Sequence, residues 1–201
     1  MPEVPSAARE RVLDVAEALF AERGLARVTM REIADAAGMR QASLYHHAPG
    51  GKEQLYRETF ERTIERHRAG LESALARAGD DLRARLRAVA DWYVGRSPMN
   101  FLRMMTSDMP ALGEEVAREL AGPAYAALMR PITDAFRAAA MRGGSRHVDP
   151  DLLAGSLLAI LDAVAFAEGR SYGDHDQRTM AYTMIDVLLD GLLPSGTADP
   201  P

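Results

Sequence analysis

The chain has 201 residues, of which 47% are hydrophobic and 26% charged, a composition typical of a globular protein with a core of its own. It contains no cysteine, which excludes disulfides, thiolate metal sites and cysteine nucleophiles. No apolar run reaches the roughly 18 residues that a membrane-spanning helix needs. The charged start MPEVPSAARERV predicts that no signal peptide is present, so we expect a cytoplasmic protein.

The net charge of −5 is unevenly distributed along the chain. Residues 1–68 contain 11 basic and 11 acidic residues, so the whole negative excess lies in residues 69–201. Phosphate binding requires a basic face rather than a basic chain. The acidic balance therefore does not exclude a nucleic-acid partner.

Hydrophobic periodicity is helical along almost the whole chain and predicts an all-α fold of about nine helices. Three short helices are expected in the first 50 residues. Ser6 should cap the first helix and Gly24 should end it. Thr29 and Glu32 have the spacing of a capping box for the second helix. The third helix is expected at residues 41–47, before a proline and two glycines.

Longer helices are predicted after residue 50, separated by glycine, proline or polar loops. They are expected at about 52–78, 81–95, 110–141, 150–168 and 177–193. Pro123 and Pro131 should break or kink the third of these. The predicted domains are a helix-turn-helix domain at 1–50, a helical domain at 51–195 and a disordered tail at 196–201.

The second and third helices, joined by the turn AAGM, have the layout of a helix-turn-helix. The stretch RQASLYHH presents short polar side chains around one aliphatic anchor, Leu44. Arg40 can donate to guanine, Gln41 to adenine, and Ala42 can touch a thymine methyl group. The side chains of Thr29, Tyr45, His46 and Lys52 are suited to contacts with phosphate oxygens. The residues predicted to contact DNA are Thr29, Arg31, Arg40, Gln41, Ala42, Ser43, Tyr45, His46 and Lys52.

Lys52 is the only lysine, and it follows two glycines at a predicted helix start. A cation is disfavoured at this end of a helix, which suggests that it serves an anion. With the N–H groups of Gly50 and Gly51 it could hold one phosphate. A solvated lysine after a turn is the alternative. A nucleotide-binding loop is not predicted, because the full spacing and the preceding strand are missing.

The sequence predicts no metal, cofactor or catalytic site. His46 and His47 point about 100° apart on a helix, and neither has a third ligand at the following turn. The stretch Asp174-His175-Asp176 is interpreted as a helix-capping loop rather than a cation site. No Ser-His-Asp arrangement stands out, so we do not expect an enzyme.

The run TMREIADAAGMRQASLYHHAPGGKEQLY resembles the DNA-binding region of the TetR family of bacterial regulators, and the resemblance spans residues 9–60. It implies an all-α homodimer that binds a near-palindromic double-stranded DNA operator, with half-sites roughly 34–36 Å apart. It also implies a small-molecule inducer bound in the C-terminal half, and no membrane partner. Two positions depart from the family's pattern: Ala48 replaces a usual aromatic residue, and the turn PGGKE has an extra glycine.

Aromatic and methionine side chains in the C-terminal half are candidate walls of an inducer pocket, although core packing explains any one of them as well. Arg103 could be an internal ligand anchor, but exposure at the surface is the favoured interpretation. The candidate pocket residues are Trp92, Tyr93, Phe101, Met104, Met105, Met109, Tyr125, Met129 and Phe166.

The last two predicted helices are so apolar that they need cover on every side, which favours a four-helix bundle between two copies over the alternative that both helices are core of one chain. The candidate dimer-interface residues are Leu153, Leu157, Ile160, Leu161, Val164, Tyr182, Ile185 and Leu189.

The sequence therefore predicts a repressor that a small, largely apolar ligand releases from its operator. Two alternatives remain: a helical protein-interaction module without a small ligand, and a helical enzyme acting on a small apolar substrate. The enzyme would need a convergent acid–base pair, which the sequence does not indicate.

Overall fold

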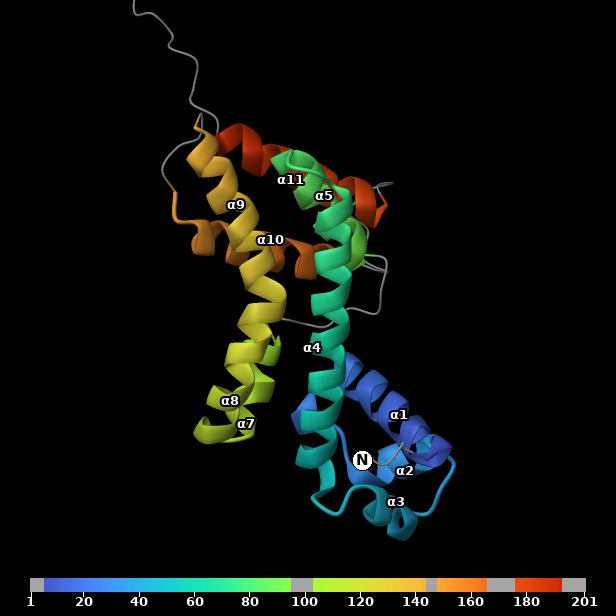
Figure 1. Cartoon of the computed structure of the whole chain (residues 1–201). Coiled ribbons are helices and arrows are strands. Elements are labelled where there is room, and N and C mark those ends of the chain that lie inside the picture. Colours follow the sequence, from blue (N-terminus) through green and yellow to red (C-terminus); the bar gives the residue numbers. More distant parts are fainter. Residues whose placement is uncertain (1–5, 95–102, 144–147, 166–175, 193–201) are drawn as a thin grey trace, which may run out of the picture. The chain divides into compact units, whose positions relative to one another are not determined.

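The computed structural model describes residues 6–94, 103–143, 148–165 and 176–192. Over these residues the chain forms nine continuous helical segments and no strand, which confirms the all-α fold (Figure 1). No helix in the described part is long and apolar enough to cross a membrane. The predicted tail at 196–201 lies outside the described residues.

The N-terminal helices lie where the sequence places them. They are α1 (Ala7–Arg23), the 3-10 turn η1 (Leu25–Arg27), α2 (Met30–Ala36) and α3 (Gln41–His47). The following helices are α4 (Gly51–Arg77), α5 (Leu82–Val94), the π-helical η2 (Met104–Asp108), α7 (Met109–Ala111), α8 (Glu114–Ala124), the π-helical η3 (Tyr125–Met129), α9 (Arg130–Arg142), α10 (Pro150–Ala165) and α11 (Gln177–Leu192).

The chain divides into two compact units. The head unit comprises Met1–Arg66 and Leu102–Gly122, and the C-terminal unit comprises His67–Phe101 and Pro123–Pro201. The first half of α4, together with η2, α7 and most of α8, therefore packs with the helix-turn-helix.

Local signals explain the helix boundaries of the head unit. The Ser6 hydroxyl accepts from the N–H of Arg9, and Gly24 ends α1 at a φ of 79°. Thr29 and Glu32 form the predicted capping box, because each side chain accepts from the other residue's backbone N–H. The hydrogen bond from the Thr29 side chain is the main cause that lowers the pKa of Glu32. These caps were predicted and are confirmed.

The predicted break at the prolines of the long central helix is not present. The segments α8, η3 and α9 follow one another without a gap, with Pro123 in α8 and Pro131 near the start of α9. The π-helical turn η3 lies between the two prolines. Its wider turn takes up the disturbance of the hydrogen-bond ladder, so the helix continues.

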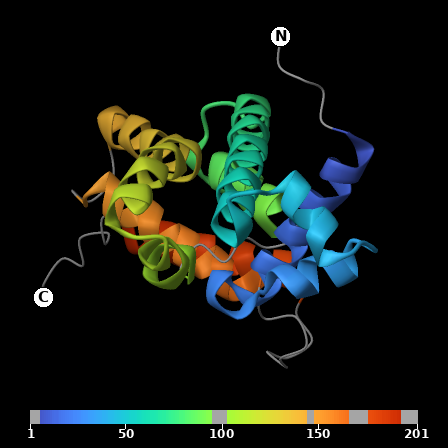
Figure 2. The same cartoon turned by 90° about the horizontal axis from the view of Figure 1, so that it is seen from below.

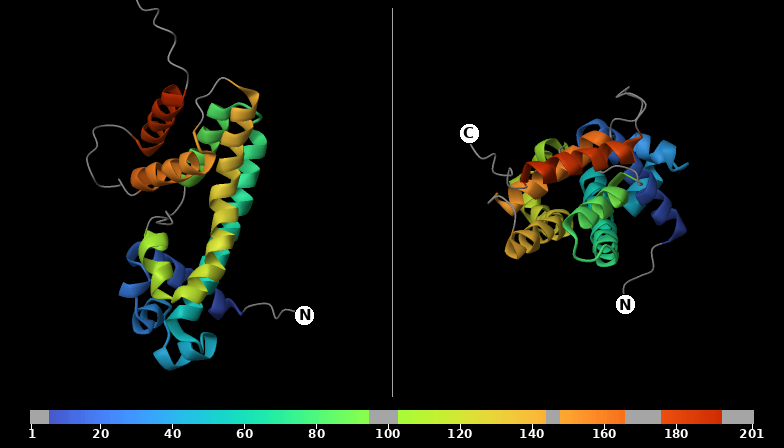
Figure 3. Two further views of the ribbon diagram at one scale, coloured as in Figure 1. Left: turned by 90° about the vertical axis from the view of Figure 1, so that its left-hand side faces the viewer. Right: turned by 90° about the horizontal axis from the view of Figure 1, so that it is seen from above.

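The C-terminal unit is a bundle in which α10 and α11 pack on α5, and α9 packs on both α5 and α10 (Figure 3). Its core includes Leu86, Leu157 and Ile185, which are fully buried. On its surface, Arg83 and Arg87 of α5 pair with Asp186 of α11. These ion pairs reinforce a contact that the buried aliphatic side chains already make.

Candidate nucleic-acid interface

The helix-turn-helix is held together by a small apolar core. Leu44 on α3 and Ile33 on α2 are each fully buried, and α1 contacts both of these helices. Figure 1 shows α1, α2 and α3 gathered as one group, and Figure 2 views the same group from below. Leu44 is thus the inward anchor that the sequence predicted, and the rest of α3 is left for other contacts.

The predicted DNA-contacting side chains share one property, which is exposure to solvent. Eight of the nine are exposed, and only Lys52 is half-buried. Gln41 begins α3, and Arg40 is the residue before it. The N-terminal end of a recognition helix is the part that meets base edges in a major groove, and these two side chains have suitable donors. The exposed residues are Thr29, Arg31, Arg40, Gln41, Ala42, Ser43, Tyr45 and His46.

In the turn between α3 and α4, the backbone N–H groups of Gly50 and Gly51 already donate hydrogen bonds within the chain. The prediction that these two groups hold a phosphate is therefore corrected. The N–H of Gly50 donates to Oε1 of Gln54 at 2.7 Å, and the N–H of Gly51 donates to the Ala48 carbonyl at 3.0 Å. Neither amide is free for an anion. The Lys52 ammonium forms no ion pair within the described residues, and its contact with a phosphate stays a prediction.

The two departures from the family's pattern have structural roles. Ala48 is fully buried at the C-terminal end of α3, where its N–H donates to the Leu44 carbonyl. Gly51 has a φ of 68°, a conformation that favours glycine, and nothing would contact an added Cβ atom there. The second glycine therefore allows the chain to turn sharply into α4.

The turn is also tied to α1 through polar side chains. Gln54, which holds Gly50, donates from Nε2 to Glu58 at 2.8 Å. Glu58 in turn accepts from the Arg9 guanidinium through both carboxylate oxygens, at 2.8 and 3.0 Å. Both contacts come from one nitrogen, Nη2, so the pair is a charge-assisted contact without the parallel fork of a bidentate pair. The start of α4 is thereby connected to the start of α1.

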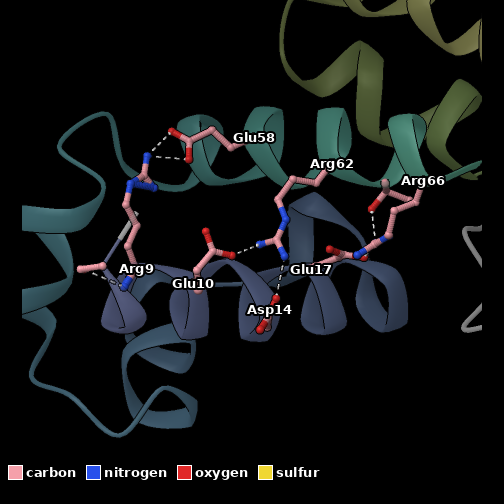
Figure 4. A network of polar contacts seen from close by, with 9 residues as sticks. Arg9, Glu10, Asp14, Glu17, Glu58, Arg62 and Arg66 are labelled. Atoms are coloured by element: carbon pink, nitrogen blue, oxygen red, sulfur yellow. Dashed lines mark hydrogen bonds and ion pairs between the residues drawn. The ribbon is translucent and has the colours of Figure 1, made fainter. Parts of the chain in front are cut away.

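Further ion pairs continue along the facing surfaces of α1 and α4 (Figure 4). Exposed pairs contribute little singly, but a row of them between two helices specifies the register of those helices. The row consists of Arg9–Glu58, Arg62–Glu10, Arg62–Asp14 and Arg66–Glu17. It keeps α1 and the first half of α4 as one rigid support for α2 and α3.

The predicted pocket residues do not all belong to the C-terminal unit. Met104 and Met109 are buried in the core of the head unit, and Met105 of the same segment is 41% exposed. The sequence placed these three methionines with a C-terminal ligand site because methionine density alone does not show which core a segment joins. Phe101 and Phe166 lie outside the described residues.

The remaining candidates lie in the C-terminal unit, with different environments. Tyr93 is buried, Trp92 and Met129 are half-buried, and Tyr125 is exposed. The Tyr125 hydroxyl donates to Asp151 at 2.6 Å, and this hydrogen bond is the main cause that lowers the pKa of Asp151. Tyr125 therefore braces the start of α10.

Sequence reasoning missed two buried polar groups in this unit. The Tyr93 hydroxyl donates to Asp162 at 2.6 Å, and burial followed by the charge of Asp162 raises the Tyr93 pKa well above its usual range. The indole N–H of Trp92 donates to Nδ1 of His67 at 3.3 Å. A usable signal was present for Asp162, because it is the only charged residue in the apolar run LLAGSLLAILDAVAF.

Most of the predicted dimer-interface residues are core residues of a single chain. Six are buried within the protomer, and Ile160 and Tyr182 are half-buried. The neighbours that cover these six belong to their own chain, so a contact of these six with a partner stays a prediction. They are Leu153, Leu157, Leu161, Val164, Ile185 and Leu189.

The loop before α11 caps a helix, as the sequence suggested. Asp176 accepts from the Thr179 N–H at 3.0 Å and from its hydroxyl at 2.8 Å, which lowers the pKa of Asp176. Asp174 and His175 lie outside the described residues. In the part of the chain that the structure describes, no group of three acidic or histidine side chains could hold a metal ion.

A short helix with an exposed polar N-terminal end, supported by two packed helices, defines a helix-turn-helix DNA-binding protein. The family model for bacterial regulatory proteins of the tetR family matches residues 12–59. The HTH-type transcriptional repressor KstR2 of Rhodococcus jostii is 31% identical over 195 residues, which is 93% of this chain and 92% of the relative. KstR2 of Mycolicibacterium smegmatis is 46% identical over 59 residues, 29% of this chain and 28% of the relative. The chain belongs to the TetR family of transcriptional regulators.

Solved structures share the fold over nearly the whole chain. A transcriptional regulator from Saccharomonospora viridis in complex with choline has a TM-score of 0.71 and 22% identity, covering 95% of this chain and 100% of that one. The ketosteroid transcriptional regulator KstR2 of Mycobacterium tuberculosis has a TM-score of 0.68 and 20% identity, covering 96% and 98%. The predicted function, a ligand-responsive DNA-binding repressor, is confirmed at the level of the family.

Proposed function

We propose that two copies of this chain bind a near-palindromic operator, each through α3 in a major groove. The observation that carries the proposal is the burial of Leu44 beneath an α3 whose other side chains remain accessible. Arg40, Gln41 and Ala42 read base edges, while Tyr45 and its neighbours bind phosphates and set the register. In this proposal the protein acts on chromosomal DNA in the cytoplasm and catalyses no reaction.

A second copy would cover the exposed apolar side chains of the last two helices. Leu152 of α10 is 63% exposed and Val187 of α11 is 60% exposed, and Met184 lies one turn before Val187. The buried side chains of the same helices hold the protomer together, so the interface uses their other faces. Two-fold pairing then gives the spacing that a near-palindromic operator requires.

The inducer in this proposal binds in the C-terminal unit, near Trp92, Tyr93 and Met129. Ketosteroid derivatives are the first ligand class to test, because KstR2 of Mycobacterium tuberculosis is a ketosteroid transcriptional regulator and KstR2 of Rhodococcus jostii is similar to this chain over nearly its whole length. A ligand that favours a conformation poorly matched to the operator lowers operator affinity by the corresponding coupling factor.

The test begins with selection of bound fragments from the native genome. A single protected near-palindrome supports the proposal, and its release by a ketosteroid derivative supports the ligand class. Binding that shows no sequence preference above competitor DNA at physiological salt would contradict the operator proposal. Operator binding that no small molecule reverses would favour the interaction-module alternative instead.

Replacement of Gln41 by alanine should relax base preference at one operator position. Gln41 is exposed at the first residue of α3, and a bidentate amide–adenine contact discriminates by about 1–3 kcal/mol. The measurement is the affinity for four operators that differ only at that base pair. Arg31→Ala is the matched control, because Arg31 is exposed on α2 and is not expected to read a base. Equal discrimination in the wild type and in Gln41→Ala would remove Gln41 from the reading set.

Replacement of Lys52 by alanine should weaken binding to all operators equally. A phosphate contact contributes counterion release, so the slope of log affinity against log salt should fall by about one. Fluorescence anisotropy at several salt concentrations measures this slope. An unchanged slope would support the alternative of a solvated lysine after the turn.

A further inference from the structure

Arg103, which the sequence placed at the surface, caps the C-terminal end of α1. Its Nη2 donates to the carbonyls of Phe20 at 2.7 Å and Ala21 at 2.6 Å, and its Nη1 donates to that of Glu22 at 3.3 Å. The last carbonyls of a helix have no donor within the helix and form the negative end of its dipole. The guanidinium of Arg103 supplies both hydrogen-bond donors and a positive charge at this end of α1. Arg103 is half-buried, with 24% of its side chain exposed, so the prediction of surface exposure holds only in part.

Asp108, the last residue of η2, contacts both Arg103 and Leu25, the residue that follows Gly24. Its side chain is buried, and Oδ1 accepts from the Leu25 N–H at 2.9 Å, while Oδ2 pairs with Nε of Arg103 at 3.3 Å. Burial, followed by the negative charge of Asp108, raises the pKa of Tyr56 on α4. Asp108 thus lies where the end of α1 and the first half of α4 meet η2.

The space around Gly24 leaves no room for a side chain. Gly24, between α1 and η1, has a φ of 79°, and an added Cβ atom would lie 2.9 Å from Oδ1 of Asp108 and 3.1 Å from Nε of Arg103. Arg103, the residue before η2, and Asp108, the last residue of η2, therefore enclose a glycine turn about eighty positions earlier in the chain. All of these residues belong to the head unit.

We propose that Arg103 and Asp108, here called the α1 clamp, are positioning residues for operator binding. The clamp holds the end of α1 and the first N–H of η1, and η1 leads within two residues to Thr29, which caps α2. Since α2 carries α3, the clamp fixes the angle at which α3 is presented. The inference rests on the proposed operator binding, and neither clamp residue touches the DNA-reading residues directly.

The test compares Arg103→Gln and Asp108→Asn with a matched control, Arg118→Gln. Arg118 is exposed in the same unit and pairs with Glu114 at 3.5 Å, so its loss tests a general charge effect. We expect both clamp variants to bind the selected operator about tenfold more weakly, with an unchanged salt slope and faster amide exchange at Leu25. The control variant should match the wild type in all three measurements.

Wild-type affinity in both clamp variants would overturn the inference, and so would a salt slope that falls by about one, since that indicates a direct phosphate contact. If a variant fails to fold by circular dichroism, Arg103→Lys replaces it. This variant keeps the charge but loses the fork of donors, so affinity between that of the wild type and one-tenth of it is expected. A wild type that binds no operator would contradict the proposed function, whereas a wild type that binds the operator together with clamp variants that bind it equally well contradicts the clamp alone.

Discussion

Replacement of Leu44 by alanine is expected to destabilise the head unit by about 2–5 kcal/mol and to abolish operator binding. Leu44 is fully buried and is the only buried side chain of α3. Truncation removes apolar contacts and leaves a cavity beneath a helix of seven residues. A helix that short has little stability without packing. The position of α3 therefore depends on this one side chain.

Two measurements separate the consequences of this change. Urea unfolding followed by circular dichroism gives the change in the free energy of unfolding, and anisotropy gives operator affinity. Met141→Ala is the control, because Met141 on α9 is 78% exposed and its truncation should leave both quantities unchanged. Full operator binding by Leu44→Ala would show that α3 is held by something other than its apolar anchor.

The helix-turn-helix could be predicted from sequence because its determinants are local. The capping box of Thr29 and Glu32 spans three residues, and Leu44 is the one aliphatic position in a polar stretch. Caps, glycine turns and a single anchor are set by near neighbours in the chain. The predicted boundaries of α1, α2 and α3 agree with the structure for this reason.

The role of Arg103 could not be predicted in the same way. Its partner carbonyls lie 81 to 83 positions earlier in the chain, and no periodicity relates them. The burial of Met104 and Met109 in the head unit could not be predicted for the same reason. A methionine-rich stretch shows that a segment is buried but not which core receives it.

The apolar helix α10 illustrates a second limit. Its mostly apolar sequence predicts cover on every side, but a leucine covered by its own chain and one covered by a partner have the same pattern. The structure separates them: Leu157 is fully buried in the protomer, and Leu152 is largely exposed. Only the second kind of position is available to a dimer partner.

Replacement of Gly24 by alanine should destabilise the head unit for two separate reasons. A φ of 79° with a ψ of 164° is a conformation that residues other than glycine adopt at a cost of about 1–3 kcal/mol. The new Cβ atom would also lie 2.9 Å from Oδ1 of Asp108, which forces the clamp to move. We expect a loss of stability at the upper end of that range and operator affinity lower by at least about tenfold.

The two causes can be separated with a second glycine of the same unit. Gly113 has a φ of 87° and nothing within 4 Å of an added Cβ atom, so Gly113→Ala should show the backbone cost alone and leave operator affinity unchanged. In an Asp108→Ala background, Gly24→Ala should cost less than in the wild type, because the carboxylate oxygen nearest the new methyl group is gone, while the contacts with Arg103 at 3.1 and 3.2 Å remain. Equal costs of Gly24→Ala and Gly113→Ala in the wild-type background would contradict the close contact. A larger cost at Gly24 that decreases when Asp108 is removed assigns that part of the cost to the clamp, and the accompanying change in operator affinity then measures how far the clamp sets the presentation of α3.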